Sequence, residues 1–253
     1  MSDPTLLVMK GIHKSFGKMK VLRGIDLTVD YGEIVALVGD NGAGKSTLIK
    51  VVTGVHRPEA GEIWYKGQKI TLHSVRESRQ LGIETVYQER ALADLQEMWR
   101  NIFAGREITN FLGFMDVKAQ RRDTERLLRE HMGFTSSAIT VNSPVKSLSG
   151  GEKQGVAIGR ALHFNADLII LDEPTMGLAL RETDRVLNFV RNFRDQGKAA
   201  IFIDHNILHV YDVADRFVIL DRGRVAGMFA KSEITQDELI ANMVHLHHTG
   251  TLQ

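Results

Sequence analysis

The chain has 253 residues, 43% hydrophobic and 25% charged, an ordinary composition for a globular protein that buries a large core. Its 32 basic and 31 acidic residues leave a net charge of +1, which excludes the strongly basic character typical of nucleic-acid-binding proteins. The absence of cysteine excludes disulfides and thiolate zinc sites.

The first third of the sequence is predicted to form strands and one helix. Residues 25–29 alternate apolar and polar side chains, as a half-buried strand does. Residues 34–38 are a continuous apolar run, which favours a fully buried strand. A helix is expected from Lys45 to about Gly54, and residues 63–65 belong to a further alternating stretch.

Residues 89–163 are predicted to form a helical insertion, because the segment has few β-branched residues and no convincing strand. One helix is expected over residues 121–132, with Leu127 and Leu128 on one side and Gly133 as its end. Another helix is expected over residues 154–163.

Strand signals return at residues 168–171, 199–203 and 217–220. The first two enclose a helix of apolar residues at helical spacing that closes at Gly197. Alternating strands and helices indicate a parallel sheet covered by helices, and thus the α/β class. The last nine residues, 245–253, are expected to fray.

No segment of the sequence indicates membrane insertion. The longest apolar runs are far shorter than the roughly 20 residues that cross a bilayer. The N-terminus has no basic region followed by an apolar core, so no secretory signal is expected. We therefore expect a soluble or peripheral protein.

Residues 39–46 match the pattern G-x-x-x-x-G-K-[ST] between a predicted strand and a predicted helix. Glycines allow backbone N–H groups to face phosphate oxygens, and the helix N-terminus adds partial positive charge. Lys45 would reach the β- and γ-phosphates, and the Ser46 hydroxyl would bind Mg²⁺. The alternative is a glycine turn that binds no ligand, but such a turn would not explain a lysine directed into a nest of backbone N–H groups.

The buried strand at 168–171 runs into two acids. Asp172 is placed to hold Mg²⁺, directly or through water, and Glu173 to orient or deprotonate the attacking water. Two acids exposed at a strand end are the alternative. The phosphate loop favours the catalytic interpretation, because nucleotides bind at the carboxyl ends of parallel strands.

A second helix start lies at 148–154, with the sequence LSGGEKQ. Ser149 and Glu152 fit a capping box. A capping box does not explain Gly150 and Gly151, which each cost a helix about 1 kcal/mol relative to alanine. Adjacent glycines there indicate that a ligand approaches the backbone closely.

Together these motifs resemble those of the ATP-binding subunit of an ATP-binding cassette (ABC) transporter. Five of them occur in the family's order: GDNGAGKST at 39–47, VYQ at 86–88, LSGGEKQ at 148–154, LIILDEP at 168–174 and FIDH at 202–205. The resemblance implies a P-loop NTPase core with a mixed or parallel sheet, an N-terminal antiparallel β subdomain and an inserted helical subdomain. It implies one ABC ATPase domain over 1–253, with the core at 1–88 and 164–253 and the helical subdomain at 89–163.

The resemblance also implies ATP and Mg²⁺ as ligands, and roles for individual residues. The expected nucleotide-binding residues are Gly39, Asn41, Gly42, Ala43, Gly44, Lys45, Ser46, Thr47 and Phe16. The expected Mg²⁺ ligands are Ser46, Gln88 and Asp172, and the expected catalytic residues are Glu173, Gln88, His205 and Lys45. Phe16 would stack on adenine, with a core or turn aromatic as the alternative. His205 would contact the γ-phosphate, although a lone histidine after a strand is more often structural.

Cassettes of this family pair head to tail, so that the signature of one copy closes over the ATP of the other. By the resemblance, Ser149, Gly150, Gly151 and Glu152 act on the ATP held by a second copy. Two helix N-termini facing one triphosphate would stabilise its charge from both sides. ATP then holds the dimer together, and hydrolysis releases it.

Several stretches look similar to monosaccharide importers of the ribose, xylose and fructose group. They lie at 86–89, 100–107, 154–158 and 204–206. Two departures from the usual cassette pattern also occur in that group: Gly155, and Ala179 in place of the aspartate that lines the interface between paired cassettes. A third departure is Glu152, where many cassettes have glutamine. The implied partners are a second copy, two integral-membrane permease subunits and, indirectly, an extracytoplasmic solute-binding protein. No nucleic acid is expected, and the implied location is the cytoplasmic face of the cell membrane.

Three alternatives stay open. The first is an importer ATPase for another small solute, such as an amino acid. The second is a soluble cassette ATPase acting on DNA or the ribosome, although the tandem cassettes, long coiled coils and zinc modules of such proteins are not seen. The third is a regulatory cassette that binds ATP but hydrolyses it slowly. The changed residue Ala179 at the dimer interface supports this alternative, and the presence of Gln88, Glu173 and His205 argues against it.

Overall fold

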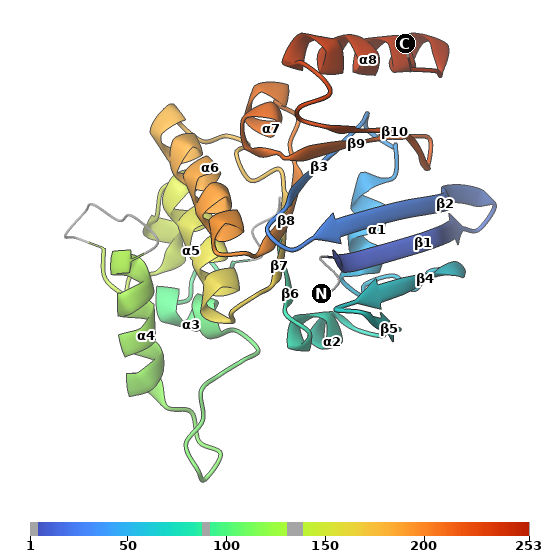
Figure 1. The fold of residues 1–253 in the computed structure, drawn as a ribbon. Coiled ribbons are helices and arrows are strands. Elements are labelled where there is room, and N and C mark those ends of the chain that lie inside the picture. Colours follow the sequence, from blue (N-terminus) through green and yellow to red (C-terminus); the bar gives the residue numbers. More distant parts are fainter. Residues whose placement is uncertain (1–4, 88–91, 131–138, 253) are drawn as a thin grey trace.

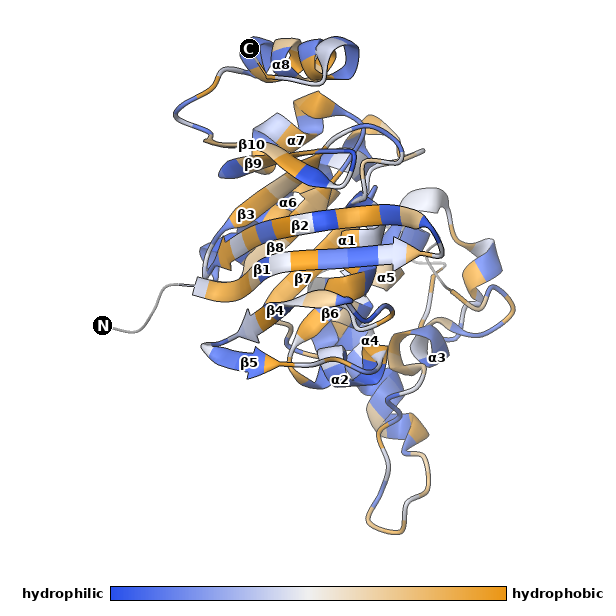
Figure 2. Ribbon diagram, turned by 90° about the vertical axis from the view of Figure 1, so that its right-hand side faces the viewer, coloured by the Kyte–Doolittle hydropathy of each residue, from blue (hydrophilic) through white to orange (hydrophobic). Residues whose placement is uncertain are grey.

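The N-terminal part of the chain forms a four-stranded antiparallel sheet in the computed structural model, which describes residues 5–87, 92–130 and 139–252. Its strands are β1 (Thr5–Phe16), β2 (Met19–Asp30), β4 (Ala60–Tyr65) and β5 (Gln68–Ile70), in the order β2-β1-β4-β5. Apolar and polar residues alternate in the second half of β2, from Ile25 to Asp30 (Figure 2). One face of this sheet is therefore buried.

The second sheet has six strands in the order β10-β9-β3-β8-β7-β6. They are β3 (Ile34–Val38), β6 (Ile83–Val86), β7 (Leu168–Asp172), β8 (Ala199–Ile203), β9 (Arg216–Asp221) and β10 (Arg224–Ala230). All neighbours pair in parallel except β10, which is antiparallel to β9. The predicted mixed sheet with an antiparallel N-terminal part is thus confirmed.

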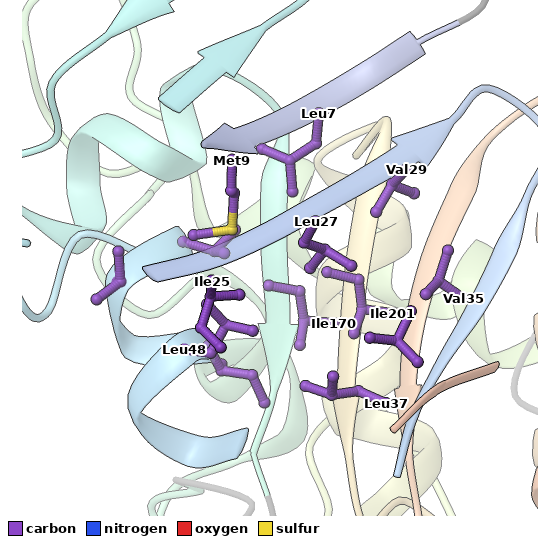
Figure 3. Close-up of a cluster of buried hydrophobic side chains, with 14 of the residues drawn as sticks. Leu7, Met9, Ile25, Leu27, Val29, Val35, Leu37, Leu48, Ile170 and Ile201 are labelled. Atoms are coloured by element: carbon purple, nitrogen blue, oxygen red, sulfur yellow. The ribbon is translucent and has the colours of Figure 1, made fainter. Parts of the chain in front are cut away.

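The central strands are apolar throughout because each separates two cores. Val35 and Leu37 of β3 face the antiparallel sheet and pack in one cluster with Leu7 and Leu27 (Figure 3). The alternate residues of β3, beginning with Ile34, belong to the cluster beneath the helices. Burial on both faces explains why this strand reads as a continuous apolar run.

One helix lies between the two sheets, and further helices cover the outer face of the mixed sheet (Figure 1). α1 (Lys45–Val52) contributes Leu48 and Val51 to the core between the sheets. The outer face is covered by α5 (Gly150–His163), α6 (Leu180–Asp195), α7 (Ile207–Val213) and α8 (Gln236–Thr249). The short α2 (Val75–Gln80) packs against β6.

A separate apolar cluster lies in the region predicted to be helical. Its elements are α3 (Met98–Phe103), α4 (Val117–Glu130), a 3-10 turn (Val145–Ser147) and part of α5. Val156 of α5 belongs to this cluster, whereas Ala157 and Ile158 belong to the core beneath the sheet. α5 therefore joins the helical region to the sheet.

Several predicted helix boundaries differ from the structure. α5 begins at Gly150, four residues before the predicted start, because the Ser149–Glu152 capping box begins the helix there. α4 begins at Val117, four residues before the predicted start, because Asp116 Oδ1 accepts the Ala119 N–H at 2.9 Å, as an N-cap does. Its predicted end at Gly133 lies outside the described residues. α1 ends at Val52, just before the expected stop at Gly54.

The prediction that residues 245–253 fray is wrong for most of that stretch. α8 starts with a reciprocal capping box between Thr235 and Glu238 and continues to Thr249. Leu246 is buried, and Gly250 ends the helix in a left-handed conformation (φ 76°). The prediction failed because Leu246 is flanked by histidines, so the sequence shows no apolar pattern although Leu246 packs against the core.

Strand β6 had no signal in the sequence, because its four residues include Glu84. This carboxylate is buried, with 2% of the residue exposed. It pairs with Arg106, and its other oxygen lies 3.7 Å from Arg79 Nε. Paired and hydrogen-bonded charges can be buried where a lone charge cannot. In the described ranges, no helix has the length and apolar character needed to cross a bilayer.

Candidate nucleotide-binding and catalytic site

The phosphate loop connects β3 to α1, and its glycines are required by the backbone. Gly39, Gly42 and Gly44 have φ of 144°, 84° and 112°, in the region that L side chains rarely adopt. A Cβ on Gly39 would lie 2.2 Å from the Leu220 carbonyl oxygen. The loop therefore curls tightly against β9, and its curvature suits a cradle of backbone N–H groups around phosphate.

Lys45 lies inside this loop and is 8% exposed. Its Nζ donates to the carbonyl oxygens of Gly39 (2.5 Å) and Asp40 (3.0 Å). Burial lowers the pKa of Lys45, while the charges of Glu173, Asp40 and Asp172 oppose that shift. The ammonium is thus held among acids and carbonyls in the place where the motif would receive a phosphate.

Asp172 ends β7, and Glu173 follows it with a strained backbone. Glu173 has φ 53°, a left-handed conformation that costs a non-glycine residue about 1–3 kcal/mol. Its N–H donates to the Ile203 carbonyl at 2.8 Å, at the end of β8. The turn keeps the Glu173 carboxylate at the sheet edge, 13% exposed.

His205 follows β8 and meets the carboxylate at the end of β7. Its Nε2 lies 2.7 Å from Glu173 Oε1, and its side chain is 53% exposed. The two residues are 32 positions apart in sequence, and the parallel pairing of β7 with β8 brings them together. The predicted base and the predicted γ-phosphate contact therefore lie in direct contact with each other.

A buried network anchors the two segments that carry Glu173 and His205, and the sequence analysis does not predict it. Thr175 Oγ1 donates to Asp204 Oδ2 at 2.5 Å and lies 3.0 Å from His209 Nδ1. Thr175 and Asp204 are 6% and 9% exposed. Because Thr175 follows Glu173 and Asp204 precedes His205, the network fixes the two segments relative to each other. The available signal was sequence position: Asp204 lies within the recognised motif at 202–205, and Thr175 directly follows the motif at 168–174.

The other predicted ligands for nucleotide and metal are spread along the same edge. Ser46 is exposed in the first turn of α1, as are Asn41 and Gly42 in the loop; Ala43 is buried and Thr47 is half-buried. A hydroxyl at Ser46 and a carboxylate at Asp172 are oxygen donors of the kind that Mg²⁺ takes. The predicted role of Gln88 falls on a residue outside the described part of the chain.

Phe16 lies at the tip of the β1–β2 hairpin and is 45% exposed, so it is not a core residue. Its ring meets His56 edge-on at 5.1 Å. The hairpin touches the phosphate loop, because a Cβ on Gly44 would lie 3.0 Å from Leu22 of β2. Phe16 thus belongs to a hairpin that borders the phosphate loop.

The second helix start stands at the N-terminus of α5. Ser149 and Glu152 form the predicted capping box, with Ser149 N–H to Glu152 Oε2 at 2.8 Å and Glu152 N–H to Ser149 Oγ at 3.2 Å. Ser149 and Gly150 are exposed, and a Cβ on Gly151 would lie 2.2 Å from the carboxyl carbon of Glu182. The side chain of Ser149 contacts Glu152 and Glu182 rather than the chain's own phosphate loop.

Comparison with known proteins identifies the family of this chain. A family model described as ABC transporter matches residues 22–176. The chain belongs to the ABC transporter family. This ABC protein is accordingly an ATP-binding ATPase of that family, as the motifs predicted.

Relatives with similar sequences carry names of sugar importers. The ABC protein is 41% identical to a xylose/arabinose import ATP-binding protein of Sulfolobus acidocaldarius, over 94% of its own chain and 93% of the relative. It is 37% identical to a fructose import ATP-binding protein of Rhizobium meliloti, over 96% and 95%. A ribose import ATP-binding protein of Caldanaerobacter subterraneus is also 37% identical, but the chain spans only 47% of that relative's length.

The fold of the ABC protein also matches solved structures. The ADP conformation of an ATP-binding cassette of an ABC transporter aligns with a TM-score of 0.82 and 24% identity, over 97% of this chain and 99% of that one. A nucleotide-free cassette aligns with a TM-score of 0.79 and 23% identity, over 94% and 95%. These likenesses establish the architecture.

The Asp172 carboxylate provides a test of the site's electrostatics. Burial raises its pKa, Glu173 adds to the effect, and Lys45 opposes it. A raised pKa means that the folded ABC protein disfavours the ionised form, so stability is lost as pH rises through the folded-state pKa. We predict that Asp172→Asn increases the free energy of unfolding of the nucleotide-free protein at pH 7 and impairs hydrolysis.

Denaturant unfolding of both proteins between pH 4 and 8 would check this prediction. The advantage of Asp172→Asn should be small near pH 4, about the unfolded-state pKa of an aspartate, and should grow at higher pH. Asp184→Asn, at an exposed position on α6, is the control and should show no such pH dependence. Equal or lower stability of Asp172→Asn at pH 7 would contradict the assigned cause of the shift.

Proposed function

We propose that this chain is the ATP-hydrolysing subunit of a monosaccharide importer, working as a homodimer on two permease subunits at the cytoplasmic face of the membrane. The observation that carries the ATPase mechanism is the convergence of Lys45, Asp172, Glu173 and His205 at one edge of the mixed sheet. The sugar assignment is supported by the xylose/arabinose and fructose import proteins, which align with this chain over nearly their full lengths.

We assign residues 1–88 and 164–253 to the nucleotide-binding core and residues 89–163 to a helical subdomain. The separate apolar cluster around α3 and α4 supports the division. α5 packs on both sides of the boundary, so it would transmit movement between the two parts. The start of α5, which carries the signature, would then shift with the helical subdomain.

In the proposed nucleotide complex, Lys45 exchanges the carbonyls of Gly39 and Asp40 for oxygens of the β- and γ-phosphates. The loop's backbone N–H groups and the start of α1 hold the remaining phosphate charge. Ser46 and Asp172, with Gln88, would hold Mg²⁺, which neutralises charge on the phosphates. Phe16 would stack on the adenine.

Glu173 and His205 supply the chemistry at the γ-phosphate. The oxygen of a water molecule bonds to the γ-phosphorus, the bond from that phosphorus to the bridging oxygen of ADP breaks, and Glu173 accepts the proton of the water. His205 holds the Glu173 carboxylate in place through the close contact of its Nε2 with Glu173 Oε1, already present at 2.7 Å. The strained Glu173 backbone keeps the base at the sheet edge.

A second copy would complete each ATP site. Ser149, Gly150 and Gly151 would face the γ-phosphate bound by the partner, with Glu152 maintaining the helix start through its capping box. The exposed position of this helix start supports an intermolecular role. Its backbone N–H groups and positive dipole end suit a phosphate.

Replacement of the proposed base tests this mechanism. Glu173→Gln keeps the size of the side chain but cannot accept the proton, so phosphate release should fall at least about a hundredfold. ATP should still bind, and the variant should accumulate as an ATP-bound dimer on size-exclusion chromatography with light scattering. Glu125→Gln, exposed on α4, is the matched control. Unchanged turnover in Glu173→Gln would show that Glu173 is not the base.

An apolar hairpin, residues 108–116, offers a docking surface for the permease. Its exposed apolar side chains are Phe111 (95%), Leu112 (64%), Phe114 (69%) and Met115 (43%). The tip projects away from both sheets (Figure 1). Its turn is held by Asn110, whose N–H donates to Phe114 O at 2.8 Å and whose carbonyl accepts the Gly113 N–H at 2.9 Å. Clustered exposed apolar groups on an ordered turn are typical of interaction sites.

Affinity purification of the tagged protein from mildly solubilised membranes tests both the function and the docking surface. We expect a polytopic permease to co-purify with the native chain in near-equal amount. The double variant Phe111→Ser, Phe114→Ser should bind ATP normally but lose the permease, because it removes the largest apolar side chains of the tip. Val244→Ser, 52% exposed on α8, is the control and should retain the permease.

The outcomes separate the parts of the proposal. A native chain that purifies without any permease would refute the transporter assignment. A permease retained by the double variant would refute only the docking surface. Uptake of monosaccharides by a strain lacking this chain decides the solute: normal uptake of every monosaccharide would refute the sugar assignment.

A further inference from the structure

The C-terminal helix α8 touches the phosphate loop directly. His247 Nδ1 lies 2.5 Å from Asp40 Oδ2, across 207 residues of sequence. Asp40 is the second residue of the loop, directly after Gly39. Gly39 and Asp40 line a small pocket together with Met243 and Leu246 of the same helix. The contact is thus more than one pair of side chains.

The position of His247 on α8 is fixed by its neighbours. Leu239 and Leu246 of the helix are buried, with 0% and 6% of each residue exposed. The helix begins at a complete capping box formed by Thr235 and Glu238. α8 is therefore packed against the core on both sides of its midpoint, and this packing fixes the position of His247 beside the loop.

Asp40 is an acid on a loop that would receive a triphosphate. Its backbone carbonyl accepts from Lys45 Nζ at 3.0 Å. Its charge is among those that oppose the lowered pKa of Lys45, so the carboxylate acts on the ammonium that would bind phosphate. A free carboxylate in this position would repel the incoming phosphates, because like charges a few ångströms apart destabilise each other.

We propose that His247 is a positioning residue for nucleotide binding: by bonding to Asp40, it holds that carboxylate against α8 and lowers its repulsion of the triphosphate. The inference rests on the proposed ATP site and assigns to α8 a role in nucleotide affinity. Both side chains are more than half exposed, 63% for His247 and 58% for Asp40. Such a pair contributes little to folding stability, so its effect should appear in ligand affinity.

Titration calorimetry with ATP and ADP, in the presence of Mg²⁺, tests the proposal. His247→Ala should weaken ATP binding about two- to fivefold, the range expected for one partly exposed charge contact. ADP, which carries less charge, should be affected less. Asp40→Asn should bind ATP at least as tightly as the native chain, and the double variant should behave like Asp40→Asn alone.

Two control variants separate positioning from general disturbance of the helix. His248→Ala removes a neighbouring exposed imidazole, whose ring meets that of His247 edge-on at 5.4 Å, and should leave the ATP Kd unchanged. His247→Arg places another side-chain N–H donor opposite Asp40 and should restore at least part of the ATP affinity lost in His247→Ala.

The proposal is overturned if His247→Ala binds ATP as His248→Ala does, or if its effect persists undiminished in the Asp40→Asn background. It is also overturned if His247→Ala weakens ATP and ADP equally. A native chain that binds neither nucleotide would instead refute the proposed function. Thermal unfolding of every variant should remain close to that of the native chain, because the exposed pair contributes little to stability.

Discussion

The parallel pairing of β3, β8 and β7 is the constraint on which the rest of the site depends. It makes three strands end at one edge, so that Lys45, Asp172, Glu173 and His205 meet although they span 160 positions of the sequence. The strands stay in register because each is buried on both faces, between the antiparallel sheet and the helices. A one-residue slip would exchange the two faces of a strand and misplace the residues that follow it.

The charged residues at this edge of the sheet are in conformations or environments that cost free energy in the nucleotide-free protein. Burial lowers the pKa of Lys45 and raises the pKa of Asp172, and Glu173 adopts a strained backbone. The Thr175–Asp204–His209 network keeps the segments of Glu173 and His205 together in spite of these costs. Conformational and electrostatic strain of this kind is common at functional sites, where a ligand compensates it. In the proposed mechanism, Mg²⁺ and the triphosphate are the ligands that do so.

Much of this arrangement could be predicted from the sequence because it depends on local rules. The glycine loop, the strand that ends in Asp172 and Glu173 and the capping box at Ser149 each have a short sequence signature, and all three occur in the structure. β6 and the last turn of α8 could not be predicted, because each depends on a tertiary partner. Glu84 is buried only because two arginines reach it, and the last turn of α8 depends on the packing of Leu246 against the core. The Asp40–His247 contact joins distant segments and leaves no local pattern.

The central claim is that one chain carries half of each of two ATP sites. Mixing two inactive variants tests it most directly: Lys45→Ala, which lacks the phosphate-loop cation, and Gly150→Asp, which places a carboxylate at the exposed start of α5. A mixed dimer has one site with both defects and one site with neither. The account predicts that the mixture hydrolyses ATP when neither variant does alone. A mixture that forms mixed dimers by cross-linking, yet hydrolyses no faster than its components, would contradict it.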